Sequence, residues 1–436
     1  MTVLVLGAAL AMMARGAAPV LTLADAERNA REHQPQLAQA RFTADAASAR
    51  ADEARAPLLP QVSGTASYQR LTGNFAPRPG VLPSATTART AASWATFDYF
   101  SFGLTASQLV YDFGQTSGRW RAAQASADAQ RGSERATASQ TLLTVRSAFF
   151  LAREQKALFE VARDTLKNLE THLAQVQAFV KMGTRPAVDL YQALADRANG
   201  RVQLINAENA YASSRAQLNQ AMGVVGPTDY EVAGEVLPPV VGEDGGLEPL
   251  VSEAERNRPD LTALEQQARA QELTVGAAQG GYGPALGIST GFTDAGPPPL
   301  NATVWNWNAT ATLTWNIFQG GLTRATVSEA RSNLSAARAQ AEVLRQQIRV
   351  DVDQARLGVR AAQGSLGAAD EVVVNARERL RLAERRYQEG VGTLVDLGDA
   401  QVALTTAAAQ RAQADYNLST SRAQLVRALG REVPLE

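Results

Sequence analysis

The side chains on which enzymes most often depend are scarce in this sequence. It contains no cysteine and only two histidines, His33 and His172. No Ser-His-Asp arrangement, phosphate-binding loop or metal-spaced cluster of His and Asp accompanies them. Without cysteine there are no disulfides, thiolate metal sites or lipid-modified amino-terminal cysteine. We therefore expect neither an enzyme nor a resident metal or cofactor, and we expect no chemical role for the histidines.

Paired carboxylates offer a different chemistry. Asp396 and Asp399 are three residues apart in a segment rich in helix formers, so they share one helix face. Asp189 lies 207 residues before Asp396 in a similar segment. Carboxylates held at close quarters raise one another's pKa and attract cations. Two simpler interpretations remain open: an ordinary solvated helix face, or helix caps at Asp189 and Asp396.

Composition and charge exclude some classes of protein. The 42 basic and 43 acidic residues leave a net charge of −1, which argues against a nucleic-acid-binding protein. Residues 1–18 resemble a secretory signal peptide, atypical because no Lys or Arg precedes the apolar run. That run is shorter than the roughly 20 residues of a transmembrane helix, and no other segment qualifies. Any crossing of a membrane must therefore use strands.

The sequence contains an internal duplication. Residues 105–223 align with 312–430 at a constant offset of 207, and residues 35–68 match 259–292 at an offset of 224. The segment between the copies is rich in Gly and Pro, so we predict a linker with at most short strands. The resulting division is a first repeat at 19–223, a linker at 224–247, a second repeat at 248–430 and a tail at 431–436.

Each repeat predicts the same order of elements: helix, strand, loop, strand, very long helix, tight turn and long helix. The helical segments are rich in Ala, Gln and Arg, and their apolar residues alternate at spacings of three and four, as in coiled coils. On the helices alone, a soluble coiled-coil scaffold is the simpler interpretation. The predicted elements are helix 36–56, strands 61–71 and 98–111, and helices 116–180 and 187–222, then helix 260–280, strands 285–293 and 303–318, and helices 322–388 and 394–429.

The strands favour a membrane protein instead. In residues 304–317, apolar side chains alternate with Asn and Thr, so that one face of the strand is apolar and the other polar. The first repeat alternates in the same way on the same face. The aromatic residues cluster toward the strand ends, as in an interfacial girdle. We assign five of them to a lipid-facing belt, with packing between subunits as the alternative: Phe100, Phe102, Trp305, Trp307 and Trp315.

Four strands cannot close a barrel alone. Open sheet edges in lipid leave backbone groups unpaired at a cost of several kcal/mol each. The smallest closed barrels use about eight strands. A barrel built from this chain must therefore be shared between copies.

These features together resemble the TolC family of outer-membrane efflux proteins, over about residues 20–430. The strand-to-helix junctions QLVYDFG at 108–114 and WNIFQGG at 315–321 are similar to those of the family, as are the helix-turn-helix tips at 182–189 and 387–400. The resemblance implies an α+β membrane protein in which a long antiparallel α-helical coiled-coil barrel continues a β-barrel, with four strands per chain and twelve in a homotrimer.

The resemblance also implies a function and partners. The homotrimer would be a passive channel in the bacterial outer membrane with a periplasmic helical tunnel. It would serve as the exit duct of a tripartite efflux or type I secretion system. Substrates would arrive from an inner-membrane transporter through a periplasmic adaptor, also called a membrane fusion protein.

Roles for the hairpin tips follow from the same resemblance. Asp396 and Asp399 match acidic positions near the periplasmic aperture, where threefold symmetry would gather six carboxylates in a cation-selective constriction that divalent ions can plug. Asp189 matches a position that helps to hold the aperture closed. The chain departs from the family at Gly392, where the prototype has a basic residue, and Arg185 holds the equivalent place in the first tip. Adaptor contact is expected at the tips, although turn geometry alone would explain the glycines: Gly183, Thr184, Arg185, Gly390 and Val391.

Overall fold

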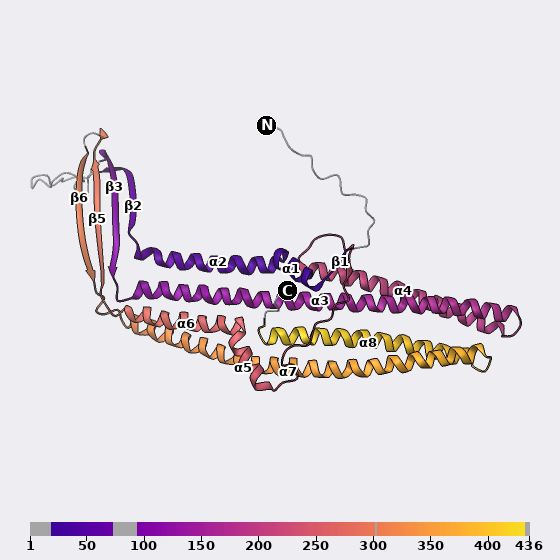
Figure 1. Ribbon diagram of the computed structural model, residues 1–436. Coiled ribbons are helices and arrows are strands. Elements are labelled where there is room, and N and C mark those ends of the chain that lie inside the picture. Colours follow the sequence, from indigo (N-terminus) through magenta and orange to yellow (C-terminus); the bar gives the residue numbers. More distant parts are fainter. Residues whose placement is uncertain (1–18, 73–93, 301–302, 432–436) are drawn as a thin grey trace, which may run out of the picture. The chain divides into compact units, whose positions relative to one another are not determined.

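The computed structural model describes residues 19–72, 94–300 and 303–431 (Figure 1). The expected signal peptide, most of the loop after the first strand and nearly all of the tail lie outside the described residues. The chain divides into two compact units. We call Thr43–Arg131 with Thr262–Glu342 the sheet unit, and Met1–Phe42 with Gly132–Leu261 and Val343–Glu436 the hairpin unit. Each unit contains segments of both repeats.

The sheet unit contains one antiparallel sheet of four strands in the order β2-β3-β5-β6. The strands are β2 (Gln61–Thr72), β3 (Thr96–Tyr111), β5 (Ala285–Gly296) and β6 (Val304–Thr314). The predicted strand 303–318 was too long, because the chain leaves the sheet after Thr314. Trp315 lies outside the sheet, and its indole N–H donates a hydrogen bond to the carbonyl oxygen of Tyr282 at 3.1 Å. Strands β2 and β6 form the two edges of the sheet.

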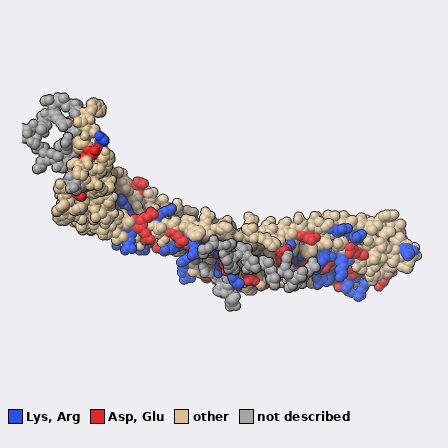
Figure 2. Space-filling view, turned by 90° about the horizontal axis from the view of Figure 1, so that it is seen from above, with Lys and Arg blue, Asp and Glu red and all other residues tan. Residues whose placement is uncertain are grey.

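The register of the sheet aligns large apolar side chains of neighbouring strands in rows on one face. Leu104 pairs with Phe292, and Phe292 pairs in turn with Trp307. Directly opposed residues share a face, so these three side chains form one row across the sheet. On the other face, Thr105 pairs with Gly291 and Gly291 with Asn308. In Figure 2 the sheet presents a mainly uncharged surface.

The junction from β3 to α3 (Gln115–Lys181) is closely packed. Phe113 adopts a left-handed conformation with φ of 52°. The carboxylate of Asp112 accepts a hydrogen bond from the backbone N–H of Thr116 at 2.7 Å, which caps the new helix. A Cβ at Gly283 would lie 2.2 Å from the ring of Phe113, so only glycine fits there.

Two antiparallel helix hairpins dominate the hairpin unit (Figure 1). The first hairpin comprises α3 and α4 (Ala187–Met222), and the second comprises α7 (Leu322–Gln388) and α8 (Leu394–Ala428). The predicted bounds agree to within one residue at every end, because turns that contain glycine bound the helical segments. None of the helices among the described residues combines the length and apolar character needed to span a lipid bilayer.

Two short helices were missed by the sequence analysis, α1 (Leu23–His33) and α5 (Leu247–Asn257). They precede α2 (Pro35–Arg55) and α6 (Pro259–Gly280), and they are related by the same offset of 224. Their ends pack against the hairpins in corresponding ways. A Cβ at Gly223 would lie 2.6 Å from the Cα of Gln34, and one at Gly430 would lie 2.8 Å from the backbone nitrogen of Arg258.

The segment from Gly223 to Leu247 packs on the hairpins without forming a helix of its own before α5, as predicted. It pairs a two-residue strand, β4 (Glu231–Val232), in parallel with β1 (Val20–Leu21). The buried carboxylate of Glu243 accepts two hydrogen bonds from Arg422 of α8, at 2.9 and 3.1 Å. The linker is thereby fixed to the second hairpin.

Candidate functional site

The two hairpin tips are tight turns that require glycine. Gly183 and Gly390 have φ of 75° and 79°, in the left-handed region where a side chain is strained. The backbone N–H of the residue after each glycine donates a hydrogen bond to a carbonyl oxygen in the last turn of the helix. Thr184 donates to Phe179 and Val391 donates to Arg386, both at 3.0 Å. A Cβ at either glycine would meet open space, so the backbone conformation alone explains them. Adaptor contact at the tips therefore stays a prediction.

The carboxylates predicted to line the aperture lie at the start of the returning helices. Asp396 forms a capping box with Thr393: its backbone N–H donates to the Thr393 hydroxyl at 3.1 Å, and its carboxylate accepts the Thr393 N–H at 3.3 Å. The cap interpretation thus holds for Asp396. Hydrogen bonding with Thr393 lowers the pKa of Asp396 from its ordinary value of 3.8, so within one chain the carboxylate is stabilised in its charged form. Asp399 is exposed on the next turn, and Asp189 is half-buried in the first turn of α4.

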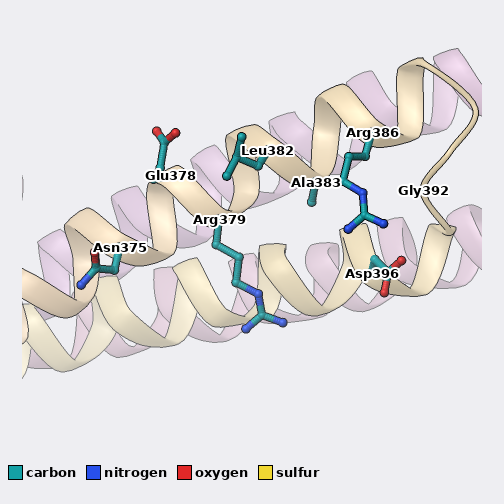
Figure 3. A pocket seen from close by; sticks show the side chains of 8 residues that line it. All are labelled: Asn375, Glu378, Arg379, Leu382, Ala383, Arg386, Gly392 and Asp396. Atoms are coloured by element: carbon teal, nitrogen blue, oxygen red, sulfur yellow. The ribbon is translucent and has the colours of Figure 1, made fainter.

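A pocket of 610 Å³ lies beside Asp396 between α7 and α8 (Figure 3). Arg379 and Arg386 of α7 both point toward α8, whereas Glu378 points away. These arginines also help to lower the pKa of Asp396. The sequence analysis considered only the acidic residues of this tip and missed the arginines, although their spacing of seven places them on one helix face.

Arg185 joins the two tips. Its guanidinium group donates to the carbonyl oxygens of Tyr387 and Gly392 at 3.3 and 3.4 Å. It also lies over the ring of Tyr387. The first tip therefore places a positive charge beside Gly392 of the second tip.

His172 was expected to have no role, but the structure places it against the second hairpin. Its ring is 5.2 Å from that of Tyr387, which is only 2% exposed. The His172 Nε2 and Tyr387 hydroxyl atoms are both buried without a hydrogen-bond partner among the described residues. They adjoin a pocket of 260 Å³, and native proteins commonly satisfy such groups with bound water. No sequence pattern signalled this pairing, because it joins the two repeats.

Four of the five residues assigned to the lipid-facing belt share one face of the sheet. Trp305 and Trp307 of β6 and Phe102 of β3 are exposed, and Phe100 is half-buried. Trp305 is 67% exposed within the single chain, which no interior packing explains. Trp315 lies just beyond the end of β6. Contact with lipid stays a prediction for all five.

Comparisons with known proteins agree with this architecture. The sequence model of the family "Outer membrane efflux protein" matches residues 26–224 and 250–431. The outer membrane protein TolC of Escherichia coli is 26% identical over 420 residues, which cover 92% of this chain and 81% of TolC. The solvent efflux pump outer membrane protein SrpC of Pseudomonas putida is 24% identical over 292 residues, which cover 66% of this chain. The match spans 61% of SrpC, less than two thirds of its length.

The fold is that of a solved channel. The outer membrane channel CmeC of Campylobacter jejuni superposes with a TM-score of 0.80 at 16% identity, over 94% of this chain and 85% of that one. This likeness confirms the predicted fold of the single chain, long helix hairpins joined to a four-stranded sheet. The family match and the similarity to TolC confirm the predicted location in the outer membrane, and the alternative of a soluble coiled-coil scaffold is not supported. The family consists of efflux channels rather than enzymes. The chain belongs to the outer membrane efflux protein family.

Proposed function

We propose that three copies of this chain form a passive exit duct through the outer membrane. Each copy contributes four strands to a barrel of twelve and two helix hairpins to a tunnel on the periplasmic side. Substrates reach the duct from an inner-membrane transporter through a periplasmic adaptor. The duct supplies no energy and no chemistry of its own.

The open edges of the sheet are the observation that carries this proposal. Among the residues that the structure describes, strands β2 and β6 each pair on one side only. Backbone N–H and C=O groups left unpaired in lipid cost several kcal/mol each, so both edges need partners. Pairing of β6 of one copy with β2 of the next satisfies both edges at once and closes a ring when the copies return to the first.

An exposed apolar row on α4 supports the same assembly. Val188, Tyr191, Val202 and Ile205 are each more than half exposed. With Ala195 and Ala198 between them, the row follows the spacing of three and four that is typical of a coiled-coil seam. Such a seam packs against another helix, and within the chain this one is left exposed.

The tips supply the functional ends of the duct in this proposal. Asp396 and Asp399, joined by Asp189, line the periplasmic aperture and make it attractive to cations. The adaptor contacts the exposed tip residues: Gly183, Thr184, Arg185, Gly390 and Val391. The transported substrates are chosen by the transporter.

Two measurements test the proposal together. Purified protein in detergent should run as a trimer before heating and as a monomer after heating in denaturing gels. The same preparation should conduct ions in discrete steps across a planar lipid bilayer. A monomer that remains dissolved without detergent and leaves the bilayer insulating contradicts the proposal.

A further inference from the structure

Two pockets at the hairpin tips are built from corresponding residues of the two repeats. The 260 Å³ pocket is lined on α3 by Asn168, Thr171, His172 and Gln175. The 610 Å³ pocket is lined on α7 by Asn375, Glu378, Arg379 and Leu382. Each residue of the second set lies 207 residues after its counterpart, which is the offset of the internal duplication. The same helix face therefore forms one wall of both pockets.

The opposite walls differ. In the smaller pocket the wall comes from the second hairpin of the same chain, with Tyr387 and Leu397 facing His172. In the larger pocket every lining residue lies between Asn375 and Asp396, within the second hairpin itself (Figure 3). The wall that a neighbouring hairpin supplies in the first case is therefore missing in the second.

The duplication identifies what fits the open side. Tyr387, Leu397 and Gly398 of the smaller pocket correspond to Val180, Leu190 and Tyr191 of the first hairpin. The first hairpin of the same chain is already engaged with the second through His172 on the other pocket. A first hairpin from another copy is thus needed to repeat the contact.

We propose that the pocket beside Arg379 and Arg386 receives the first hairpin of a second copy of this chain, with Tyr191 of that copy against the two guanidinium groups. The inference rests on the homotrimer proposed above, and it specifies the contact by which neighbouring tips meet. On this helix face, the contact inside a chain joins His172 to Tyr387, whereas the contact between chains joins Arg379 and Arg386 to Tyr191.

The chemistry of the pocket suits an aromatic ring. The pocket's carboxylates are engaged elsewhere, Glu378 by Arg381 and Asp396 by Thr393. Arg379 and Arg386 form no ion pair within the part of the chain that the structure describes. The negative face of an aromatic ring attracts guanidinium groups, and Leu382 between the arginines offers apolar contact. Tyr191 is 70% exposed in the single chain, so its ring is available.

Cysteine cross-linking tests the contact, because the natural chain has no cysteine. The pair Val180→Cys with Arg379→Cys is the counterpart of Tyr387 and His172, and it should join chains into a covalent trimer on treatment with a short bifunctional thiol reagent. The pair His172→Cys with Tyr387→Cys should cross-link within one chain and leave the denatured mass unchanged. Val180→Cys with Val343→Cys, on the same α7 but 36 residues earlier, should give no covalent trimer, and neither should any single cysteine.

The outcomes separate this inference from the proposed function. A covalent trimer in the first pair alone supports the contact. If the unheated trimer and the intrachain cross-link both form but the first pair leaves only monomers after denaturation, the contact is wrong and the trimer stands. If the unsubstituted protein forms no trimer, both the contact between tips and the proposed trimeric duct are wrong. As a second measurement, Tyr191→Ala should lower the temperature at which the trimer dissociates, and Tyr191→Phe should retain it.

Discussion

The guanidinium carbon of Arg185 lies 4.6 Å from the centre of the Tyr387 ring. The two residues belong to different hairpins, so the stack ties one tip to the other. The same guanidinium group reaches the carbonyl oxygen of Gly392, the residue that corresponds to Arg185 in the second repeat. One arginine therefore serves both tips of a chain.

Replacing Arg185 with alanine should loosen the second tip. A cation–π contact is worth about 0.5–2 kcal/mol depending on its exposure to water. Losing it should speed amide hydrogen exchange over residues 380–390 by roughly 2- to 30-fold, provided that these amides exchange through local opening. Arg215→Ala is the matched control, because Arg215 lies over Tyr211 at 4.7 Å in a region remote in sequence from the tip. Equal exchange rates in both variants would show that the Arg185 side chain stabilises the tip neither through the stack nor through its hydrogen bonds.

The packing of His172 should make the joint between the hairpins sensitive to acid. Burial lowers the pKa of His172 from its ordinary value of 6.5, while Asp196 and Asp189 oppose the shift. A histidine with a lowered pKa stabilises the folded state in its neutral form. That contribution is fully present above pH 6.5 and is lost as the pH falls through the folded value.

The measurement compares exchange at the tip with and without the histidine. Between pH 7.5 and pH 5.5, after correction for intrinsic rates, residues 380–390 should become less protected in the natural protein. The His172→Gln variant should lose this dependence. His33→Gln should keep it, because His33 is exposed on α1. If the loss of protection at low pH persists in His172→Gln, a group other than His172 causes it.

The buried ion pair between Arg422 and Glu243 should be costly to break. Both side chains are nearly inaccessible, at 10% and 4% exposed. Arg422→Ala leaves the Glu243 carboxylate buried without its partner, which costs about 3–5 kcal/mol. The paired variant Glu243→Ala with Arg422→Ala should recover part of that loss. Denaturant midpoints of the natural protein, the two single variants and the double variant check this prediction. It is contradicted if the stability losses of the two single variants add up to that of the double variant. Arg349→Ala, which removes an exposed pair with Glu248, should change little.

The sequence was sufficient to predict most of the fold because its periodicities are strong. Helix α7 was predicted with its observed bounds, since the spacing of three and four runs unbroken between glycine turns. The alternation in β6 likewise predicted the face of Trp305 and Trp307. Helices α1 and α5, each of only 11 residues, were missed although both are strongly amphipathic.

The candidate site was less predictable because its contacts join the repeats. Asp396 could be located from its motif, but its capping by Thr393 and the nearby arginines depend on the folded tip. His172 and Tyr387 lie 215 residues apart, and nothing in the local sequence of either signals their contact. Tertiary packing, rather than local pattern, brings such residues together.

The tip glycines distinguish turn geometry from adaptor contact. Gly183→Ala and Gly390→Ala force a Cβ into the left-handed region, which costs about 1–2 kcal/mol each. Asparagine tolerates that conformation, so the Asn variants should retain the turn and the trimer. If the adaptor approaches these glycines closely, the Asn variants should still fail to bind it in a pull-down and to restore efflux in a deletion strain. Normal efflux in the Asn variants assigns the glycines to the turn alone. Gly226→Ala, in the linker with normal φ and open space, is the control.

The aperture carboxylates should set the selectivity of the duct. Asp396→Asn with Asp399→Asn removes two charges per chain while keeping side chains of the same shape, and asparagine at 396 can still accept the Thr393 N–H. An aspartate carboxyl of ordinary pKa is charged at pH 7, and within one chain hydrogen bonding with Thr393 lowers the pKa of Asp396 further. The variant should therefore shift the reversal potential in a potassium chloride gradient toward zero and should raise the concentration of divalent cation needed for block.

The direction of this result separates two contributions at the same tip. Arg379→Gln with Arg386→Gln should move the reversal potential the other way, toward stronger cation selectivity, because it removes the positive charges beside Asp396. Asp229→Asn, an exposed acidic residue of the linker, should leave both measurements unchanged. Selectivity and divalent block that stay constant across the Asp396 and Asp399 variants would place the constriction elsewhere in the duct.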